Sequence, residues 1–119
     1  MDVMEFVAHN PGVIHATIHR PGVGQPRMRK GRTIKVPDCS DAFHVYAVKW
    51  YPDRLAFFVD DKKYLTFPNE GPDRWTFDKK FYLLLNLAIG GAWGGQKGVD
   101  AEGWPQKYLV DYVRVYQKP

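Results

Sequence analysis

The first seven residues of the chain, MDVMEFV, place two carboxylates, Asp2 and Glu5, among apolar neighbours. A carboxylate pair can divide proton transfer and nucleophilic attack between its members. Side chains alternate along a strand, so a spacing of three sends the two acids to opposite faces. A β-bulge, with Val3 and Met4 supplying the extra residue, would bring both acids to one face. On spacing alone, two surface acids at a strand edge are the simpler interpretation.

The segment VIHATIHR changes this balance, because His15, Thr17 and His19 alternate with Ile14, Ala16 and Ile18. Over residues 14–19, one face is His-Thr-His and the opposite face is purely apolar. A polar strand face is ordinarily the solvent side and carries Lys or Glu, whereas two His and a Thr beside a carboxylate strand indicate a cleft lining. The two His are about 13 Å apart at a rise of about 3.3 Å per residue, too far to share one metal ion.

Turn sequences such as HNPG, YPDR and EGWPQ recur at short intervals, with β-branched and aromatic runs between them. This pattern is typical of an all-β sandwich or barrel. The chain of 119 residues suffices for one domain. The pattern predicts one short helical turn at 70–78 and a hairpin at 55–67. Predicted strands cover residues 1–7, 13–19, 32–36, 43–50, 55–60, 63–67, 81–89 and 108–117.

The composition excludes several classes of protein. The net charge is +4, and part of the excess lies in RMRKGR at 27–32. That run has no interleaved aromatic residues, so we predict a solvated loop and not a nucleic-acid site. The lone Cys39 excludes an internal disulfide and a CxxC metal site. No apolar run reaches membrane-spanning length, and the first residues lack the basic region followed by an apolar region that is typical of a signal peptide. Trp50 and Trp75 are predicted to be core residues.

Four stretches together resemble the C-terminal half of the catalytic domain of glycoside hydrolase family 16, of the laminarinase (endo-β-1,3-glucanase) type. They are DVMEFVAHNPGVIHATIH, FHVYAVKWYPDRLAFFVDD, FYLLLNLAIGGAWGG and WPQKYLVDYVRVYQ. The resemblance implies an all-β, concanavalin-like β-jelly-roll sandwich, present in residues 1–119 only as its C-terminal part. It also implies hydrolysis of O-glycosidic bonds in β-1,3- or mixed β-1,3-1,4-glucans by a retaining mechanism.

The family's signature is Glu-x-Asp-x-x-Glu on a bulged strand that lines the concave face. By this resemblance, Asp2 matches the middle Asp, which supports the pair, and Glu5 matches the general acid/base. The nucleophilic Glu would precede Met1 by one position. We therefore expect Met1 to be an internal residue of the catalytic strand, and we expect this chain alone to be inactive. Ala8 departs from the Gly or Gln common at its position in the family.

The resemblance also implies further site residues. His15, Thr17 and His19 would contact the sugar, and so would Asn86 and Trp93 from later segments. A buried structural amide for Asn86 and a core cap for Trp93 remain alternatives. Asp111 resembles an aspartate that helps to bind a structural calcium in many members, although the chemistry needs no cofactor. The remaining calcium ligands would come from backbone in the preceding half of the domain.

The implied partner is a β-glucan polysaccharide, with no nucleic acid or membrane, and the family implies an extracellular or periplasmic location. Without a preceding half-domain, strands such as 81–89 would be uncovered, so we expect self-association through exposed strands. Two alternatives to a hydrolase are a non-catalytic β-glucan-binding module and a degenerate half-domain. The presence of Asp2 and Glu5 favours the hydrolase, because a binding module has no need of a protonatable pair.

Overall fold

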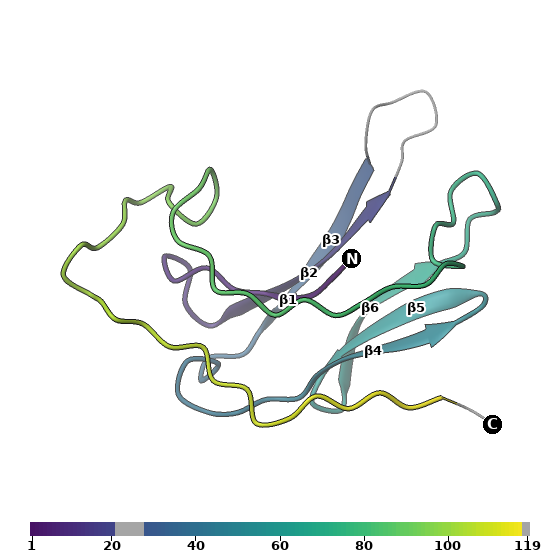
Figure 1. Cartoon of the computed structure of the whole chain (residues 1–119). Helices are drawn as coiled ribbons and strands as arrows, with labels where there is room; N and C mark the ends of the chain where they lie inside the picture. Colours follow the sequence, from purple (N-terminus) through teal and green to yellow (C-terminus); the bar gives the residue numbers. More distant parts are fainter. Residues whose placement is uncertain (21–27, 118–119) are drawn as a thin grey trace. The chain divides into compact units, whose positions relative to one another are not determined.

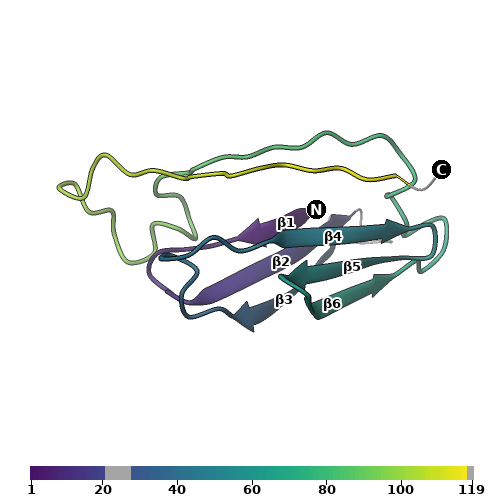
Figure 2. The ribbon, with the colours of Figure 1, turned by 90° about the horizontal axis from the view of Figure 1, so that it is seen from below.

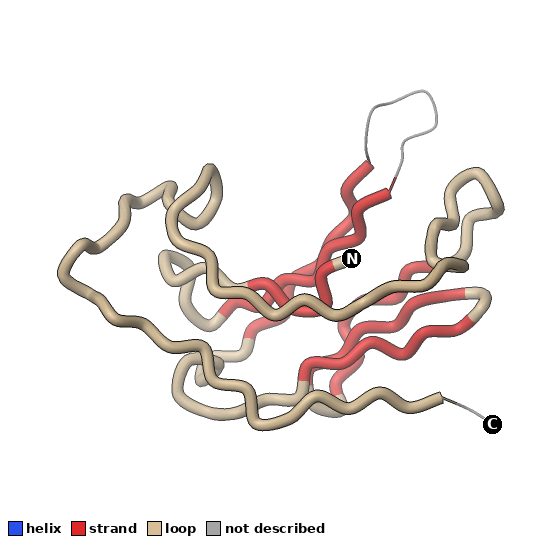
Figure 3. The backbone as a smooth tube through the Cα atoms, in the orientation of Figure 1, coloured by secondary structure: helices blue, strands red, loops and turns tan. Residues whose placement is uncertain are grey.

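The computed structural model describes residues 1–20 and 28–117 of the chain (Figure 1). The described chain divides into two compact units, Met1–Tyr82 and Leu83–Pro119, and each is described by itself. Strands of the described residues occur only in the first unit, and no helix occurs among them (Figure 3). Those residues accordingly offer no helix long and apolar enough to cross a membrane.

The first sheet contains β1 (Asp2–Glu5), β2 (Val13–Arg20) and β3 (Met28–Lys35) in the order β1-β2-β3. Both neighbouring pairs are antiparallel. The central strand β2 therefore has a partner on each edge, and it carries the alternating VIHATIHR pattern expected from the sequence.

The second sheet contains β4 (Tyr46–Tyr51), β5 (Arg54–Val59) and β6 (Lys62–Pro68) in the order β4-β5-β6, again antiparallel. Val59 pairs with Lys62, so the predicted hairpin turns over two residues. Asp60 adopts a φ of 52° there, which Asp tolerates better than most residues and which a tight hairpin turn requires.

The inner faces of the two sheets share one hydrophobic core. Figure 2 shows the strands of both sheets lying along roughly the same axis, with neighbouring strands antiparallel, as in an aligned sandwich. A fully buried Ile, Leu or Phe contributes about 1.5–3 kcal/mol through removal of apolar surface from water. The largest fully buried apolar side chains come from β2, β5 and β6, and they are Ile14, Ile18, Leu55, Phe57 and Phe67.

Two predicted strands are wrong. Residues 81–89 and 108–117 carry the expected apolar runs, but they form no strand in the structure. Their large apolar side chains are exposed, for example at Leu84 and Val115. A strand needs hydrogen-bonding partners as well as a suitable composition, and the structure pairs neither segment with another strand.

Residues 70–78 hold a single turn, closed by Trp75 N–H donating to Gly71 O at 2.8 Å, and no helix.

The predicted loop at the basic run is also wrong, because β3 begins at Met28 and runs through it. Arg27 lies outside the described residues. The Lys and Arg side chains of β3 are exposed at a sheet edge, where charge opposes pairing with another chain. Trp75 is a core residue as predicted, whereas Trp50 remains 40% exposed at the end of β4.

A histidine joins the loop before β4 to the β5–β6 turn. His44 Nδ1 lies 3.0 Å from Asp60 Oδ2, and Nε2 lies 3.3 Å from Asp38 Oδ1. Asp60 Oδ1 also accepts a hydrogen bond from Val45 N–H at 3.0 Å. The hydrogen bond to Asp60 and the nearby charge of Asp38 raise the pKa of His44. The Val45 amide and His44 lower the pKa of Asp60.

These shifts predict a bell-shaped contribution to stability. The raised pKa of His44 gives stability that is complete below its usual value and is lost as pH rises through the raised value. The lowered pKa of Asp60 gives stability that is lost as pH falls through the lowered value. We expect His44→Gln to lower the melting temperature most between about pH 4 and about pH 6.5, and progressively less above. Thermal unfolding across pH tests this, and an equal loss at all pH values contradicts it.

Candidate active site

A β-bulge places Asp2 and Glu5 on one face of the first sheet, as predicted. Asp2 pairs with Thr17 and Glu5 pairs with His15, so three steps along β1 match two along β2. The register shifts between the two acids. Met1, Val3 and Met4 pack against the hydrophobic core, on the side away from the acids. The extra residue therefore reconciles the odd spacing of the acids with a single polar face.

Both acids contact β2. Thr17 Oγ1 donates a hydrogen bond to Glu5 Oε2 at 2.6 Å. His19 Nε2 lies 2.8 Å from Asp2 Oδ2, a distance that fits an N–H donor on a carboxylate. Thr17 is only 2% exposed, so its hydroxyl is held in one place and orients the Glu5 carboxylate. Four of the predicted site residues thus form two donor–acceptor pairs across β1 and β2.

His15 lies directly opposite Glu5 in the strand pairing. Burial lowers the pKa of His15 and outweighs the nearby Glu5 carboxylate, which raises it; the Arg29 guanidinium lowers it further. The neutral imidazole is therefore favoured beside Glu5 at neutral pH. A neutral ring can both donate and accept a hydrogen bond, as contact with sugar hydroxyls requires.

Two residues of β3 that the sequence analysis did not assign to the site support it. Arg29 pairs with His19 and Gly31 pairs with Thr17. A Cβ at Gly31 would lie 2.9 Å from Ala16 O and 3.4 Å from Thr17 Oγ1. Gly31 therefore leaves the room in which the Thr17 hydroxyl sits. A glycine within a strand indicates such a close approach, but this signal was hidden inside a run interpreted as a loop.

The other predicted residues belong to the second unit. Trp93 is half-buried within a glycine-rich turn, and Asn86 and Asp111 are exposed on extended segments. Their proposed places beside a sugar or a cation stay predictions. Across residues 1–20 and 28–117, no group of three His, Cys, Asp or Glu side chains could hold a metal ion. The calcium at Asp111 stays a prediction, because its other ligands would be backbone oxygens of the preceding half of the domain.

The surroundings of His15 predict how its titration responds to substitution. We expect the imidazole to titrate below its usual value of about 6.5. Glu5→Gln should lower the pKa further, because it removes the charge that raises it, and Arg29→Gln should raise it. NMR titration of the imidazole resonances measures both shifts, with His44, which is expected above 6.5, in the same sample. A shift of opposite sign in either variant would contradict this arrangement.

Known proteins resemble this chain in sequence and in fold. The chain is 46% identical over 125 residues to a β-glucanase of Rhodothermus marinus, covering 98% of this chain and 44% of that protein. It is 33% identical over 132 residues to glucan endo-1,3-β-glucosidase A1 of Niallia circulans, covering 99% of this chain and 19% of that protein. The X-ray structure of the Rhodothermus marinus laminarinase superposes with a TM-score of 0.77 and 41% identity, over 87% of this chain and 44% of that one.

The chain therefore spans less than half the length of these relatives and corresponds to the C-terminal part of a laminarinase. The expected jelly-roll class agrees with the two antiparallel sheets and with this structural neighbour. The sequence model of Glycosyl hydrolases family 16 matches residues 1–114. On the matched sequence, the fold and the bulged acidic strand, the chain belongs to glycosyl hydrolase family 16.

Proposed function

We propose that this chain carries the acid/base part of the catalytic centre of an endo-β-glucanase that acts on β-1,3- or mixed β-1,3-1,4-linked glucan. The observation that supports it most directly is the hydrogen bond from Thr17 to Glu5, on a bulged strand that also presents Asp2. The relatives named β-glucanase and glucan endo-1,3-β-glucosidase support the substrate class.

A retaining glycosidase uses two carboxyl groups about 5–5.5 Å apart. One attacks the anomeric carbon and forms a glycosyl–enzyme ester, while the other protonates the departing glycosidic oxygen. The second group, now a carboxylate, then takes a proton from the water that hydrolyses the ester. We assign this second role to Glu5. Thr17 orients its carboxylate, and Asp2, held by His19, supports the charge balance of the pair.

In this proposal, residues 1–119 do not supply the nucleophile. The family pattern puts a Glu one position before Met1, so the attacking carboxylate would come from polypeptide that precedes this sequence. Without that group no glycosyl–enzyme ester forms. We therefore propose that residues 1–119 alone do not hydrolyse glucan, and that activity appears when the preceding part of the domain is joined to them.

A chimaera tests this proposal. The part of the Rhodothermus marinus β-glucanase that precedes the matched stretch is fused directly before Met1, with Glu as the last residue before the junction. We expect the chimaera to hydrolyse laminarin with retention at the anomeric carbon, observed by NMR, and residues 1–119 alone to release no product. Glu5→Gln in the chimaera should lower kcat/KM by about 10²–10⁴-fold, as expected for loss of a general acid/base.

Glu102→Gln is the matched control, because it makes the same substitution at an exposed carboxylate of the second unit. Its activity should equal that of the unsubstituted chimaera. A folded chimaera without activity, or a Glu5→Gln variant with full activity, overturns the proposal. A folded chimaera that binds laminarin without cleaving it would favour the non-catalytic binding module.

The role of Thr17 gives a separate prediction. Thr17→Val keeps the shape of this buried side chain and removes only the hydroxyl that donates to Glu5. Loss of one hydrogen bond corresponds to about threefold to tenfold in kcat/KM, and we expect that decrease in the chimaera. Thr66→Val on β6, an exposed threonine, is the control and should have no effect. Equal activity of the two variants would show that Thr17 does not orient Glu5.

A further inference from the structure

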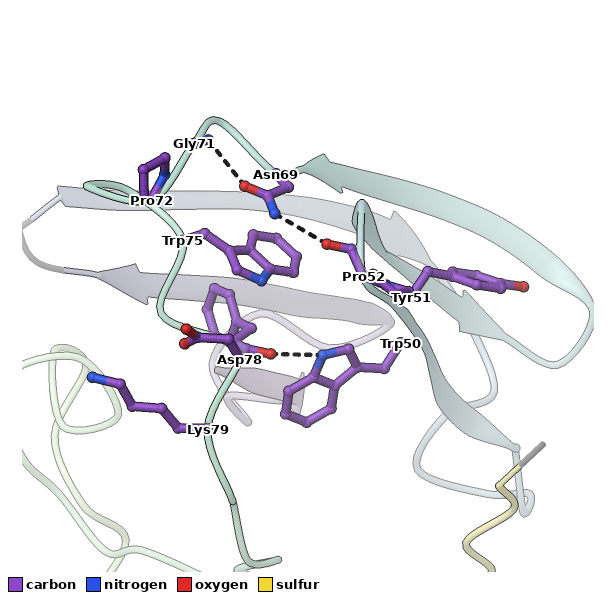
Figure 4. A pocket seen from close by; sticks show the side chains of 10 residues that line it. Trp50, Tyr51, Pro52, Asn69, Gly71, Pro72, Trp75, Asp78 and Lys79 are labelled. Atoms are coloured by element: carbon purple, nitrogen blue, oxygen red, sulfur yellow. Dashed lines mark hydrogen bonds between the residues drawn. The ribbon is translucent and has the colours of Figure 1, made fainter. Parts of the chain in front are cut away.

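A second concave site lies in the first unit, at the end of the second sheet. It is a cavity of about 730 Å³ between the β4–β5 turn and the loop that follows β6. Figure 4 shows side chains from both segments converging on it, among them Trp50, Asn69, Trp75 and Asp78. It shares no residue with the Asp2–Glu5 site. Its volume lies within the range of about 300–1,000 Å³ that is usual for small-ligand pockets.

One amide holds the two walls of this pocket together. Asn69 Nδ2 donates to Pro52 O at 3.0 Å, and Asn69 Oδ1 accepts from Gly71 N–H at 2.9 Å (Figure 4). The Asn69 backbone N–H also donates to Asp53 O at 2.7 Å. Because both walls are tied through the same residue, the cavity is formed in the absence of a ligand, and binding need not order it.

The aromatic rings are also fixed before any ligand arrives. Trp50 Nε1 donates to Phe77 O at 2.9 Å, and the indole packs edge-on against Phe81 with ring centroids 5.2 Å apart. Trp75 stacks on Phe67, with centroids 6.2 Å apart and planes within 9° of parallel. Trp75 is buried in the floor, whereas Trp50 keeps 40% of its surface exposed. Apolar surface of the Trp50 indole is exposed to water, and covering it with a ligand is favourable. Because the ring is also fixed in place, it can stack against a ligand that has an apolar face.

The charged side chains of the lining restrict the chemistry of that ligand. Asp78 offers acceptors and Lys79 offers donors, and both are exposed. The two charges are opposite and both are exposed to solvent, so the lining favours neither an anionic nor a cationic ligand. The ligand that fits is neutral, carries groups that both donate and accept hydrogen bonds, and has an apolar face. A pyranose ring combines these properties, since its C–H bonds lie on one face and its hydroxyls at the edge.

We propose that this pocket, defined by Trp50, Tyr51, Asn69, Trp75, Asp78 and Lys79, is a second binding site for the β-glucan chain, separate from the site of cleavage. The substrate class rests on the proposed function. Trp50 stacks on a sugar ring, and Asp78 accepts hydrogen bonds from the hydroxyls of the bound chain. A polymer held at one site meets the other at a raised effective concentration, so the second site keeps a long glucan at the protein between encounters with the acids.

NMR titration of the 119-residue chain with laminarihexaose tests the proposal, because separate resonances report on the two sites. The indole N–H signals of Trp50 and Trp75 report on the pocket, and the imidazoles of His15 and His19 report on the acidic site. We expect the Trp50 and Trp75 signals to shift and to saturate, while the Trp104 indole signal stays unchanged. Maltohexaose, an α-linked glucan of the same length, should shift none of them.

Trp50→Ala should weaken glucan binding at the pocket by about two- to tenfold, which is the change in affinity expected for loss of one aromatic contact. The indole N–H signal of Trp75 reports this binding. Trp104→Ala is a closely matched control: Trp104 is 41% exposed, and its Nε1 donates to Asp100 O at 2.8 Å. Asp78→Ala, an exposed position, should weaken binding by about threefold to tenfold without disturbing the core, and it keeps the test decisive if Trp50→Ala does not fold.

The outcomes separate this proposal from the proposed function. Shifts at His15 and His19 with unchanged Trp50 and Trp75 signals overturn the second site and leave the proposed function standing. Shifts at Trp50 and Trp75 alone support the second site and count against the acidic site as a glucan cleft. Equal shifts with maltohexaose overturn the assignment to β-glucan. Equal weakening by Trp104→Ala and Trp50→Ala overturns the pocket, as does an absence of shifts at all four residues.

Discussion

The side chains of β1 alternate between the two faces of the sheet, and one extra residue interrupts this alternation. Together these two features decide the face on which Asp2 and Glu5 lie. In a regular strand, Asp2 and Glu5 would lie on opposite faces, and one of the two carboxylates would be driven into the core. The bulge removes this conflict, since Val3 and Met4 both pack inward while both acids pair outward with β2. A bulge leaves backbone groups unpaired, and the packing of two apolar side chains offsets that cost.

The strand β2 transmits this arrangement to the rest of the first unit. Its inner face buries Ile14, Ala16 and Ile18 completely, and its outer face presents the residues that hold the acids. A slip of one residue between β1 and β2 would expose the apolar face and bury the polar one, so the core fixes the register. The hydrogen bond between Thr17 and Glu5 is thus positioned by hydrophobic packing on the opposite face of the same strand.

The sequence predicted what depends on local pattern. The alternation of residues 14–19 was sufficient to predict β2 and its polar face. The spacing of Asp2 and Glu5 left both a bulge and two surface acids open, and the resemblance to the family favoured the bulge that the structure has. What it missed depends on neighbours. Gly31 is informative only when β3 is known to lie beside Thr17. Trp50 has a large apolar side chain of the kind found in cores. It lies at the end of its strand, however, where packing against Phe77 and Phe81 covers only part of the ring.

Strand pairing also decides which of the predicted site residues are brought together in this structure. The sheet of β1, β2 and β3 is built from consecutive strands, so closing it requires only short connections. Residues 83–89 are apolar on both faces, as in a central strand, and the structure shows no partner strand for them. The contacts that hold Asp2 and Glu5 are complete within the first sheet. Any part that Asn86 plays in binding substrate therefore depends on strands that pair with its own segment, while the geometry of Glu5 does not.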